Sequence, residues 1–298
     1  MMKTPYRPTR PLGPGAPPVS AIGYGGMPLS TADRPDEPAA LRVLHAVMDG
    51  GVTLIDTANV YCLDDADIGH NERLIAKGLA TWSGDATRVV VATKGGMRRP
   101  GGRWVRDGRP EFLKASCEQS LEALGVEQID LYQLHAPDPD VPFADSVGAL
   151  AELREAGKVR WVGLSNVSVR QIDQARDLVP VVTVQNRLNP FFREAVTTGV
   201  VAHCARLGIG FLAYSPVGGG RLNRKLPGHP VLREIARRHG ASPHAVTLGW
   251  VLAQGPTVIP IPAARSVEHA MDSLTAPDVP LTAEDLRRLD EAEFSSRP

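Results

Sequence analysis

The sequence predicts a closed barrel of eight parallel β-strands in which each strand is followed by an α-helix. Short β-branched and apolar runs alternate with longer amphipathic stretches about eight times along the 298 residues. Helical crossovers of this kind allow successive strands to pair in parallel. Eight units in this length fit a (β/α)8 TIM barrel better than an open sheet with a second domain. We therefore expect a single domain over residues 1–298, with a short N-terminal segment that could form a hairpin and a C-terminal helix.

Four strand and helix pairs are expected in the first half of the chain. Gly125 and Gly157 directly follow amphipathic stretches, where glycine commonly ends a helix because it tolerates the left-handed conformation. The expected strands span residues 21–24, 52–56, 88–93 and 130–135, and the expected helices span residues 38–50, 71–81, 110–124 and 143–156.

The alternation continues in the second half, where two helix starts carry capping signals. Ser242 precedes Pro243, and Thr282 precedes two acidic residues of a first turn. The expected strands span residues 159–164, 181–185, 210–213 and 257–261. The expected helices span residues 169–177, 194–207, 230–239, 243–253 and 267–274, with a last helix starting at residue 282.

Composition and charge argue against several functional classes. The 33 basic and 33 acidic side chains give a net charge of zero, so neither nucleic acid nor an anionic membrane is an expected partner. Two short basic clusters, Arg98-Arg99 and Arg237-Arg238-His239, are interpreted as solvated surface. No apolar run approaches the ~20 residues of a membrane span.

Cysteine content and the N-terminus bear on the cellular compartment. The three cysteines include no CxxC pair, which favours a reducing compartment over a disulfide framework or a zinc site. Residues 1–18 are rich in proline and lack the apolar centre of a signal peptide. A cytoplasmic location is therefore expected, and nothing in the sequence indicates an oligomeric state.

Four polar residues occur where predicted strands give way to loops. Asp56, Lys94 and His135 each close one of three consecutive strands, and Tyr61 follows Asp56 by five residues. Because the strand ends on one rim of a barrel converge on a single pocket, these side chains are expected to meet.

The four residue types suit proton transfer without a metal. A tyrosine phenol has an ordinary pKa of about 10, and a neighbouring ammonium lowers that pKa by favouring the phenolate. A carboxylate keeps the ammonium charged and in place, and an imidazole can donate to a substrate oxygen. Such a set serves the protonation of an oxygen whose carbon receives hydride.

Each residue also has a purely structural interpretation. Asp56 could cap a turn, Lys94 could be a solvated loop residue, and His135 could be a packing residue. A metal-dependent barrel hydrolase using His135, Asp138 and Asp140 is a further alternative. These three residues lie in one proline-stiffened loop, so we favour an ordinary turn and expect no metal.

Several motifs together resemble the aldo-keto reductase family, and the match runs nearly end to end, from residue 23 to residue 273. The strongest segments are Asp56-Thr57-Ala58-Asn59-Val60-Tyr61, Gly163-Leu164-Ser165-Asn166, Val184-Gln185-Asn186 and Ala213-Tyr214-Ser215-Pro216-Val217-Gly218. The resemblance implies a (β/α)8 barrel and NADPH-dependent reduction of aldehydes or ketones. It also implies that Tyr61 is the acid, with Asp56, Lys94 and His135 as its partners.

The nicotinamide cofactor that the resemblance implies has no Rossmann fingerprint here, because no GxGxxG opens a helix. Ser165, Asn166 and Gln185 present hydroxyl and amide groups suited to a carboxamide, and Tyr214 offers a flat face to the ring. By resemblance these four residues hold the nicotinamide. Along the pyrophosphate the resemblance places Ser215, Pro216, Val217, Gly218 and Gly219, whereas the glycine run alone would indicate a flexible turn.

The adenine end departs from the family pattern. Arg265 could clamp the 2′-phosphate of NADPH, because a guanidinium matches phosphate geometry. The second basic position is His269, and Asp272 and Ser273 complete the segment. NADPH is expected, with NADH as the alternative.

Substrate choice is assigned to the loops at the mouth of the barrel. Tyr24, Met27 and Trp104 are the expected substrate-contacting residues, and an open pocket for varied small carbonyl compounds is expected. A second functional hypothesis is a redox sensor or regulatory subunit of the same fold, which would bind the nicotinamide cofactor and turn over slowly.

Overall fold

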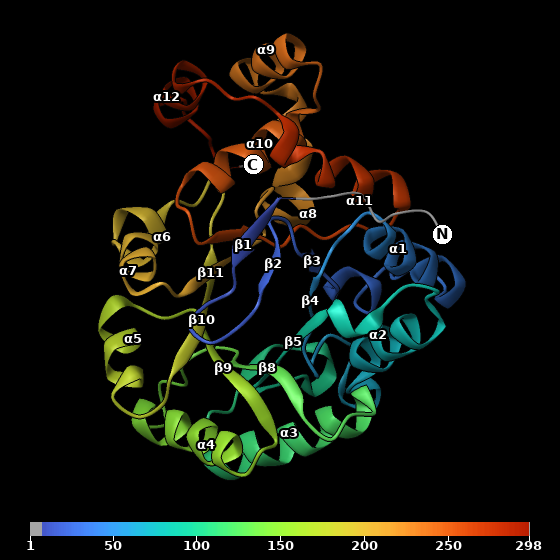
Figure 1. The fold of residues 1–298 in the computed structure, drawn as a ribbon, viewed down its shortest axis with the longest axis vertical. Coiled ribbons are helices and arrows are strands. Elements are labelled where there is room, and N and C mark those ends of the chain that lie inside the picture. The colour runs from blue at the N-terminus through green and yellow to red at the C-terminus, as the bar shows by residue number, and fades with distance from the viewer. Residues whose placement is uncertain (1–7, 298) are drawn as a thin grey trace.

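The computed structural model describes residues 8–297 and contains an eight-stranded parallel sheet that curls around a central axis (Figure 1). Neighbouring strands follow the order β3, β4, β5, β8, β9, β10, β11, β12. The two outer strands are joined by backbone hydrogen bonds from Gly23 N to Pro260 O and from Gly25 N to Pro262 O, each 2.9 Å. The sheet therefore closes, and the expected (β/α)8 TIM barrel is confirmed. The strands are β3 (Tyr24–Gly25), β4 (Leu54–Asp56), β5 (Val90–Gly95), β8 (Ile129–Leu134), β9 (Val159–Ser165), β10 (Val181–Arg187), β11 (Gly210–Tyr214) and β12 (Val258–Pro260).

The interior of the barrel is built in layers two residues apart. An apolar layer contains Leu54, Ala92 and Leu131 among other buried residues. Two residues further along the same strands stand Asp56, Lys94 and Gln133, all buried. Because alternate side chains of a strand point to the same face, the polar layer lies directly above the apolar one.

An N-terminal hairpin closes the end of the barrel where the strands begin. β1 (Thr9–Pro11) pairs antiparallel with β2 (Pro18–Ser20), as the sequence suggested, and the hairpin crosses the barrel in Figure 1. Leu12 is fully buried in the interior apolar cluster. A Cβ atom on Gly210 would lie 2.0 Å from the carbonyl oxygen of Leu12, so glycine is required there. Within residues 8–297 the hairpin covers this end of the barrel, so we expect a ligand to enter at the end where the strands finish.

Helices surround the barrel and bury their apolar faces against the strands (Figure 1). Side-chain caps at Asp36, Ser168, Ser242 and Thr282 fix four of the helix starts. Within residues 8–297, every helix falls short of the length and apolar character needed to cross a bilayer. The helices are α1 (Glu37–Asp49), α2 (His70–Thr81), α3 (Pro110–Leu124), α4 (Phe143–Glu155), α5 (Val169–Arg176), α6 (Glu194–Thr197), α7 (Val200–Leu207), α8 (Gly219–Leu222), α9 (Pro230–His239), α10 (Pro243–Ala253), α11 (Val267–Leu274) and α12 (Ala283–Glu291).

Two segments differ from the expected elements. The helix expected over residues 194–207 is two helices, because Gly199 adopts a φ of 79° between α6 and α7. The loop after β5 is not structureless, since β6 (Met97–Arg98) and β7 (Val105–Arg106) form a short antiparallel hairpin. This second hairpin brings Trp104 to the open end of the barrel.

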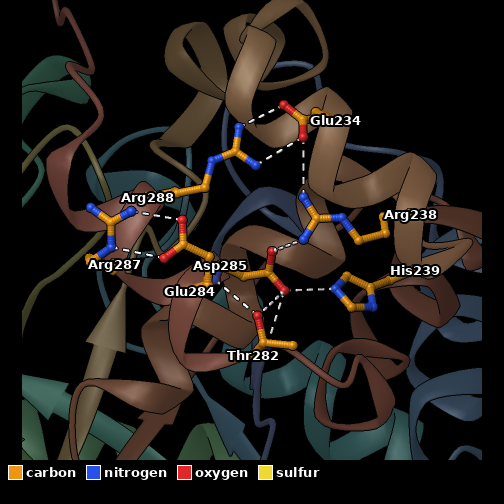
Figure 2. A network of polar contacts seen from close by, with 8 residues as sticks. All are labelled: Glu234, Arg238, His239, Thr282, Glu284, Asp285, Arg287 and Arg288. Atoms are coloured by element: carbon orange, nitrogen blue, oxygen red, sulfur yellow. Dashed lines mark hydrogen bonds and ion pairs between the residues drawn. The ribbon is translucent and has the colours of Figure 1, made fainter.

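A buried carboxylate ties the C-terminal helix to α9 (Figure 2). Asp285 of α12 is fully buried and accepts hydrogen bonds from Arg238 Nη1 at 2.6 Å and His239 Nε2 at 2.8 Å. It also accepts from Thr282 in a capping box. The interpretation of Arg237-Arg238-His239 as solvated surface is therefore wrong for His239, whose side chain is 10% exposed, whereas Arg238 binds the same acid with a side chain that stays 43% exposed.

Candidate active site

The ammonium group of Lys94 is the centre of the polar layer. Lys94 is fully buried, and its Nζ donates to Asp56 Oδ1 at 2.6 Å, to Thr57 O at 2.9 Å and to Tyr61 Oη at 2.9 Å. An ammonium has three hydrogens and no acceptor, so these bonds use all its donors. The phenolic oxygen of Tyr61 is then the acceptor, and its own proton is free to be donated elsewhere.

Two glutamine side chains lie within hydrogen-bonding distance of Asp56 Oδ2, the oxygen that Lys94 does not bind. Gln185 Nε2 donates to Asp56 Oδ2 at 2.7 Å, and Gln133 Nε2 lies 3.3 Å from the same oxygen. Asp56 is thus held from both sides in a site that is almost closed to water. The sequence reasoning missed Gln133, although a polar residue between Tyr132 and Leu134 near the end of a buried strand was an available signal.

Burial and charge act in opposite directions on the pKa of Tyr61. Desolvation raises the pKa of the phenol, the charge of Lys94 lowers it, and the net direction is upward. The expectation that the ammonium dominates is therefore wrong for this structure, because Tyr61 is only 8% exposed. For Lys94, desolvation lowers the pKa, but the charges of Asp56 and Tyr61 outweigh it and raise the net pKa. Both groups are protonated at neutral pH.

His135 stands beside Tyr61 as a neutral imidazole. Desolvation, and then the charge of Lys94, hold the pKa of His135 well below its ordinary value. Its ring centroid lies 5.8 Å from that of Tyr61 and 6.3 Å from that of Trp104, and Tyr61 and Trp104 are 6.2 Å apart. Three rings therefore meet edge to face around one point at the open end of the barrel.

The first turn of α2 braces two of the strand ends from outside the barrel. Thr57 Oγ1 donates to Asn71 Oδ1 at 2.7 Å, and Asn71 Nδ2 donates to Gly26 O at 2.9 Å. Thr93 Oγ1 donates to Glu72 Oε1 at 2.5 Å. Asn71 and Glu72 are fully buried, and their partners are the chain neighbours of Asp56 and Lys94. The sequence reasoning missed this pair, because acidic residues are common in an exposed first turn.

The four residues expected to hold the nicotinamide lie together at the ends of β9, β10 and β11. Asn166 Nδ2 lies 3.1 Å from Ser165 Oγ, and Tyr214 Oη donates to Asn166 Oδ1 at 2.8 Å. Ser165 Oγ donates to the backbone oxygen of Gln185 at 2.8 Å. The Tyr214 ring is partly exposed beside these amide and hydroxyl groups. This combination of a flat face and polar groups fits a nicotinamide carboxamide.

The segment expected along the pyrophosphate is a tight turn that leads into α8. Ser215 adopts a φ of 48°, and Asn166 at the end of the neighbouring strand adopts 59°. Non-glycine residues in this region are strained and occur preferentially at functional sites. Gly218 and Gly219 also have positive φ, and a Cβ on Gly219 would have no neighbour closer than 3.8 Å. Pro216 and Val217 complete the turn, which has open space beside Gly219.

The residues expected at the adenine end are divided between two environments. Arg265 and His269 are exposed, and Arg265 donates to Ala32 O at 2.7 Å and to Pro28 O at 3.3 Å. Asp272 instead accepts from Ser242 Oγ at 2.6 Å, while Ser273 donates back into its own helix. Arg265 and His269 are therefore accessible to a phosphate, and Asp272 and Ser273 are already engaged.

Two of the three expected substrate residues are accessible. Trp104 is 45% exposed and Met27 is 41% exposed. Tyr24 is 3% exposed, and its hydroxyl donates to Ala264 O at 2.6 Å. The expected contact of Tyr24 with the substrate is therefore wrong, because its side chain is buried between the barrel and the surrounding helices. Gly23 and Gly25, its neighbours in the chain, are the positions that face inward.

The loop after His135 has a structural explanation. Asp138 accepts from the backbone nitrogens of Gly108 at 2.8 Å and of Asp140 at 3.0 Å. Both of its carboxylate oxygens are thereby occupied by backbone donors, as in an ordinary turn.

The barrel and the site of buried lysine, tyrosine and aspartate beside a partly buried histidine define a class of oxidoreductase without a Rossmann domain. The model of the aldo/keto reductase family matches residues 21–293, and the chain belongs to this family. The chain is therefore an oxidoreductase. Its family generally reduces carbonyl compounds with nicotinamide cofactors.

Relatives with similar sequences cover most of the chain. An uncharacterized oxidoreductase of Schizosaccharomyces pombe is 34% identical over 278 residues, which is 92% of this chain and 86% of that protein. A probable aldo-keto reductase of Glycine max is 33% identical over 303 residues, covering 92% of this chain and 85% of the relative.

Solved structures show the same architecture. The glycerol dehydrogenase of Gluconobacter oxydans superposes with a TM-score of 0.81 at 30% identity, covering 95% of this chain and 94% of that one. An aldo-keto reductase of Bacillus halodurans gives a TM-score of 0.78 at 26% identity, covering 98% and 99%.

Proposed function

We propose that the protein is an NADPH-dependent reductase of aldehydes or ketones in which Tyr61 donates the proton. The bond from Lys94 Nζ to the Tyr61 oxygen at 2.9 Å carries this proposal. It fixes the phenolic oxygen as an acceptor and leaves the Tyr61 proton for another oxygen.

Each residue of the site has a distinct task in this proposal. Tyr61 transfers its proton to the carbonyl oxygen as that oxygen gains negative charge. Lys94 stabilises the resulting phenolate through a charge-assisted hydrogen bond, and Asp56 keeps Lys94 charged. His135, being neutral, donates a hydrogen bond that orients the carbonyl oxygen. The nearly complete burial of the group excludes water, which strengthens each of these interactions.

The cofactor assignment rests on the donors at the ends of β9, β10 and β11. Ser165, Asn166 and Gln185 would bind the carboxamide, and the ring would lie on Tyr214. When bound there, the reduced nicotinamide supplies the hydride. Arg265 favours NADPH over NADH, because its exposed guanidinium can bind a 2′-phosphate.

A steady-state assay tests the proposal. Wild-type protein is expected to consume NADPH with 4-nitrobenzaldehyde or 9,10-phenanthrenequinone. Tyr61→Phe is expected to abolish carbonyl reduction and to leave NADPH affinity within about twofold, because it removes one hydroxyl that has no place in cofactor binding. Turnover retained by Tyr61→Phe would rule out Tyr61 as the proton donor. Tight NADPH binding without turnover by the wild type would indicate the redox sensor instead.

A further inference from the structure

Arg99 is a buried cation that forms no ion pair with any side chain of residues 8–297. It lies in the loop between β5 and α3 and is 6% exposed, so its interpretation as solvated surface is wrong. Its Nη2 donates to Cys62 O at 3.1 Å and to Leu63 O at 3.2 Å. Among residues 8–297, its Nε and Nη1 are buried and have no hydrogen-bond partner. Two carboxylates of these loops pair with other arginines, Asp67 with Arg34 and Asp107 with Arg109.

A buried guanidinium with two unpaired nitrogens is unfavourable unless a ligand supplies hydrogen-bond acceptors for them. A guanidinium remains charged at any physiological pH and carries five hydrogen-bond donors. Burying it costs free energy that carbonyl oxygens offset only in part, and each unpaired buried donor adds to that cost. An anionic oxygen that reached the two open nitrogens would remove the deficit.

The position of Arg99 connects it to the reacting group. Its Cζ lies 4.0 Å from the ring centroid of Trp104, on which the guanidinium stacks. Trp104 in turn lies 6.2 Å from Tyr61 and 6.3 Å from His135 between ring centroids. Arg99 is therefore one aromatic ring away from the proton donor, a separation that one small substrate molecule can bridge.

The ring that covers Arg99 is exposed to solvent and follows two glycines. Trp104 is 45% exposed, and Gly101 and Gly102 before it both adopt positive φ. A Cβ on Gly101 would meet nothing within 4 Å, so this part of the hairpin is loosely packed. A shift of the Trp104 side chain would open the guanidinium to the substrate pocket.

The charge of the surrounding loop is a second, independent observation. Residues 97–111 contain five arginines against two acids, in a chain whose charges otherwise balance. The five are Arg98, Arg99, Arg103, Arg106 and Arg109. This loop borders the open end of the barrel, so the field there attracts anions.

We propose that Arg99 and Trp104 form a substrate subsite for an anionic oxygen group, so that the preferred carbonyl compounds carry a carboxylate or a phosphate. The inference rests on the proposed carbonyl reduction and names its substrate class. The aromatic ring covers the body of the substrate, and the guanidinium binds its charged end.

Pairs of substrates that share an aldehyde and differ in a charged group test this subsite. 4-Formylbenzoate is compared with its neutral methyl ester, and glyceraldehyde 3-phosphate with glyceraldehyde, in wild type, Arg99→Met, Arg99→Lys and Arg106→Met. Wild type is expected to favour at least one charged member by about tenfold or more in kcat/KM, and the favoured pair identifies carboxylate or phosphate as the ligand. Arg99→Met should abolish the preference and leave the neutral substrate within about threefold, while Arg99→Lys should keep part of it.

Other results overturn the proposal. Equal kcat/KM for charged and neutral substrates in wild type would do so, as would a preference that survives in Arg99→Met. An equal loss for both members of a pair in Arg99→Met would show that Arg99 only supports Trp104. The exposed Arg106 is the matched control, and an equally large effect of Arg106→Met would assign the preference to the overall charge of the loop.

Failure of the proposed function remains distinguishable from failure of the subsite. If wild type reduces none of these compounds, the proposed function fails. Calorimetric titration with benzoate and with inorganic phosphate then decides the subsite by itself. Binding to wild type that Arg99→Met abolishes supports it, and absence of binding, or equal binding to both proteins, rejects it. Thermal melts of each variant establish that it is folded.

Discussion

The oxygen of Tyr61 accepts a hydrogen bond from the ammonium of Lys94 at 2.9 Å, inside a group that solvent barely reaches. The direction of this bond matters as much as its length. Lys94 also donates to Asp56 and Thr57, so it has no hydrogen left for a substrate. This geometry supports the proposed role of Tyr61 as the proton donor, with Lys94 stabilising the phenolate that remains.

The dependence of the reaction on pH should differ between its two directions. Burial raises the pKa of Tyr61 above its ordinary value of 10.0, so the phenol is protonated at neutral pH. Reduction needs the protonated form, and its kcat/KM should stay level from about pH 6 to 9 and fall above about pH 10. Alcohol oxidation needs the phenolate and should rise over that range. Measured profiles in both directions check this, and a reduction profile that falls through pH 8 would contradict it.

The same profiles report on His135. Because its pKa is held well below the ordinary value, the imidazole stays neutral throughout the neutral range. No inflection from this residue is expected near pH 6.5. An inflection there that disappears in His135→Gln would show that the imidazole titrates in the working enzyme.

The hydrogen bond between Thr93 and Glu72, behind the end of β5, should affect the turnover rate. Thr93→Val removes the hydroxyl that donates to Glu72 at 2.5 Å and leaves the fully buried side chain nearly isosteric. We expect kcat to fall by roughly tenfold because Lys94 loses its alignment, while KM for the cofactor changes little. Steady-state kinetics measure both parameters, and Thr87→Val on the surface is the matched control.

Glu72 offers a conservative test of the same hydrogen bond. Desolvation raises the pKa of its carboxyl, so Glu72→Gln keeps the acceptor at little electrostatic cost and should retain most of the activity. Glu72→Leu should behave like Thr93→Val. Equal losses in the glutamine and leucine variants would mean that the carboxyl does more than accept the Thr93 bond.

The hydrogen bonds from Arg238 and His239 of α9 to Asp285 of α12 should make the stability of the protein fall at low pH. Burial by itself raises the pKa of Asp285, but hydrogen bonds from His239 and Thr282 and the charge of Arg238 outweigh it and lower the pKa to about 2. The stabilisation is therefore complete above the unfolded-state pKa, about 4, and is lost as pH falls from 4 towards 2.

Replacing Asp285 tests these hydrogen bonds directly. Asp285→Asn should cost about 2 kcal/mol at pH 7, or roughly 5 °C in Tm, because charged hydrogen bonds to a buried group are lost. Thermal melts at pH 7 and pH 3 check it. A difference from wild type that is as large at pH 3 as at pH 7 would show that the charge of Asp285 contributes nothing.

Cofactor choice should depend on Arg265. Arg265→Ala removes an exposed guanidinium that now bonds to Pro28 O and Ala32 O. We expect NADPH affinity to fall by about tenfold or more and NADH affinity to change much less, because only NADPH carries the 2′-phosphate. Fluorescence titrations with both cofactors measure this. Equal losses would mean that the phosphate is recognised elsewhere or that the loop has moved.

The local pattern of the chain was sufficient for the barrel and for the meeting of Asp56, Tyr61, Lys94 and His135. Strand periodicity places every second residue on one face, and parallel strands bring their ends to one rim. Both rules act over a few residues, so they can be read without coordinates. Helix ends followed from a different local signal, namely capping side chains and glycines.

Tertiary packing decided the properties that depend on burial and on neighbours distant in the chain. Arg98 and Arg99 are adjacent and chemically identical, yet only Arg99 is buried, because the Cys62–Leu63 backbone and Trp104 close over it. Tyr24 does not face the substrate pocket for a similar reason, because the surrounding core buries it and Ala264 O accepts its hydroxyl. The direction of the Tyr61 pKa followed from desolvation, which is a property of the whole fold. Local sequence therefore determines which strand, helix or loop carries a side chain. The surrounding structure determines whether water or protein contacts its polar end.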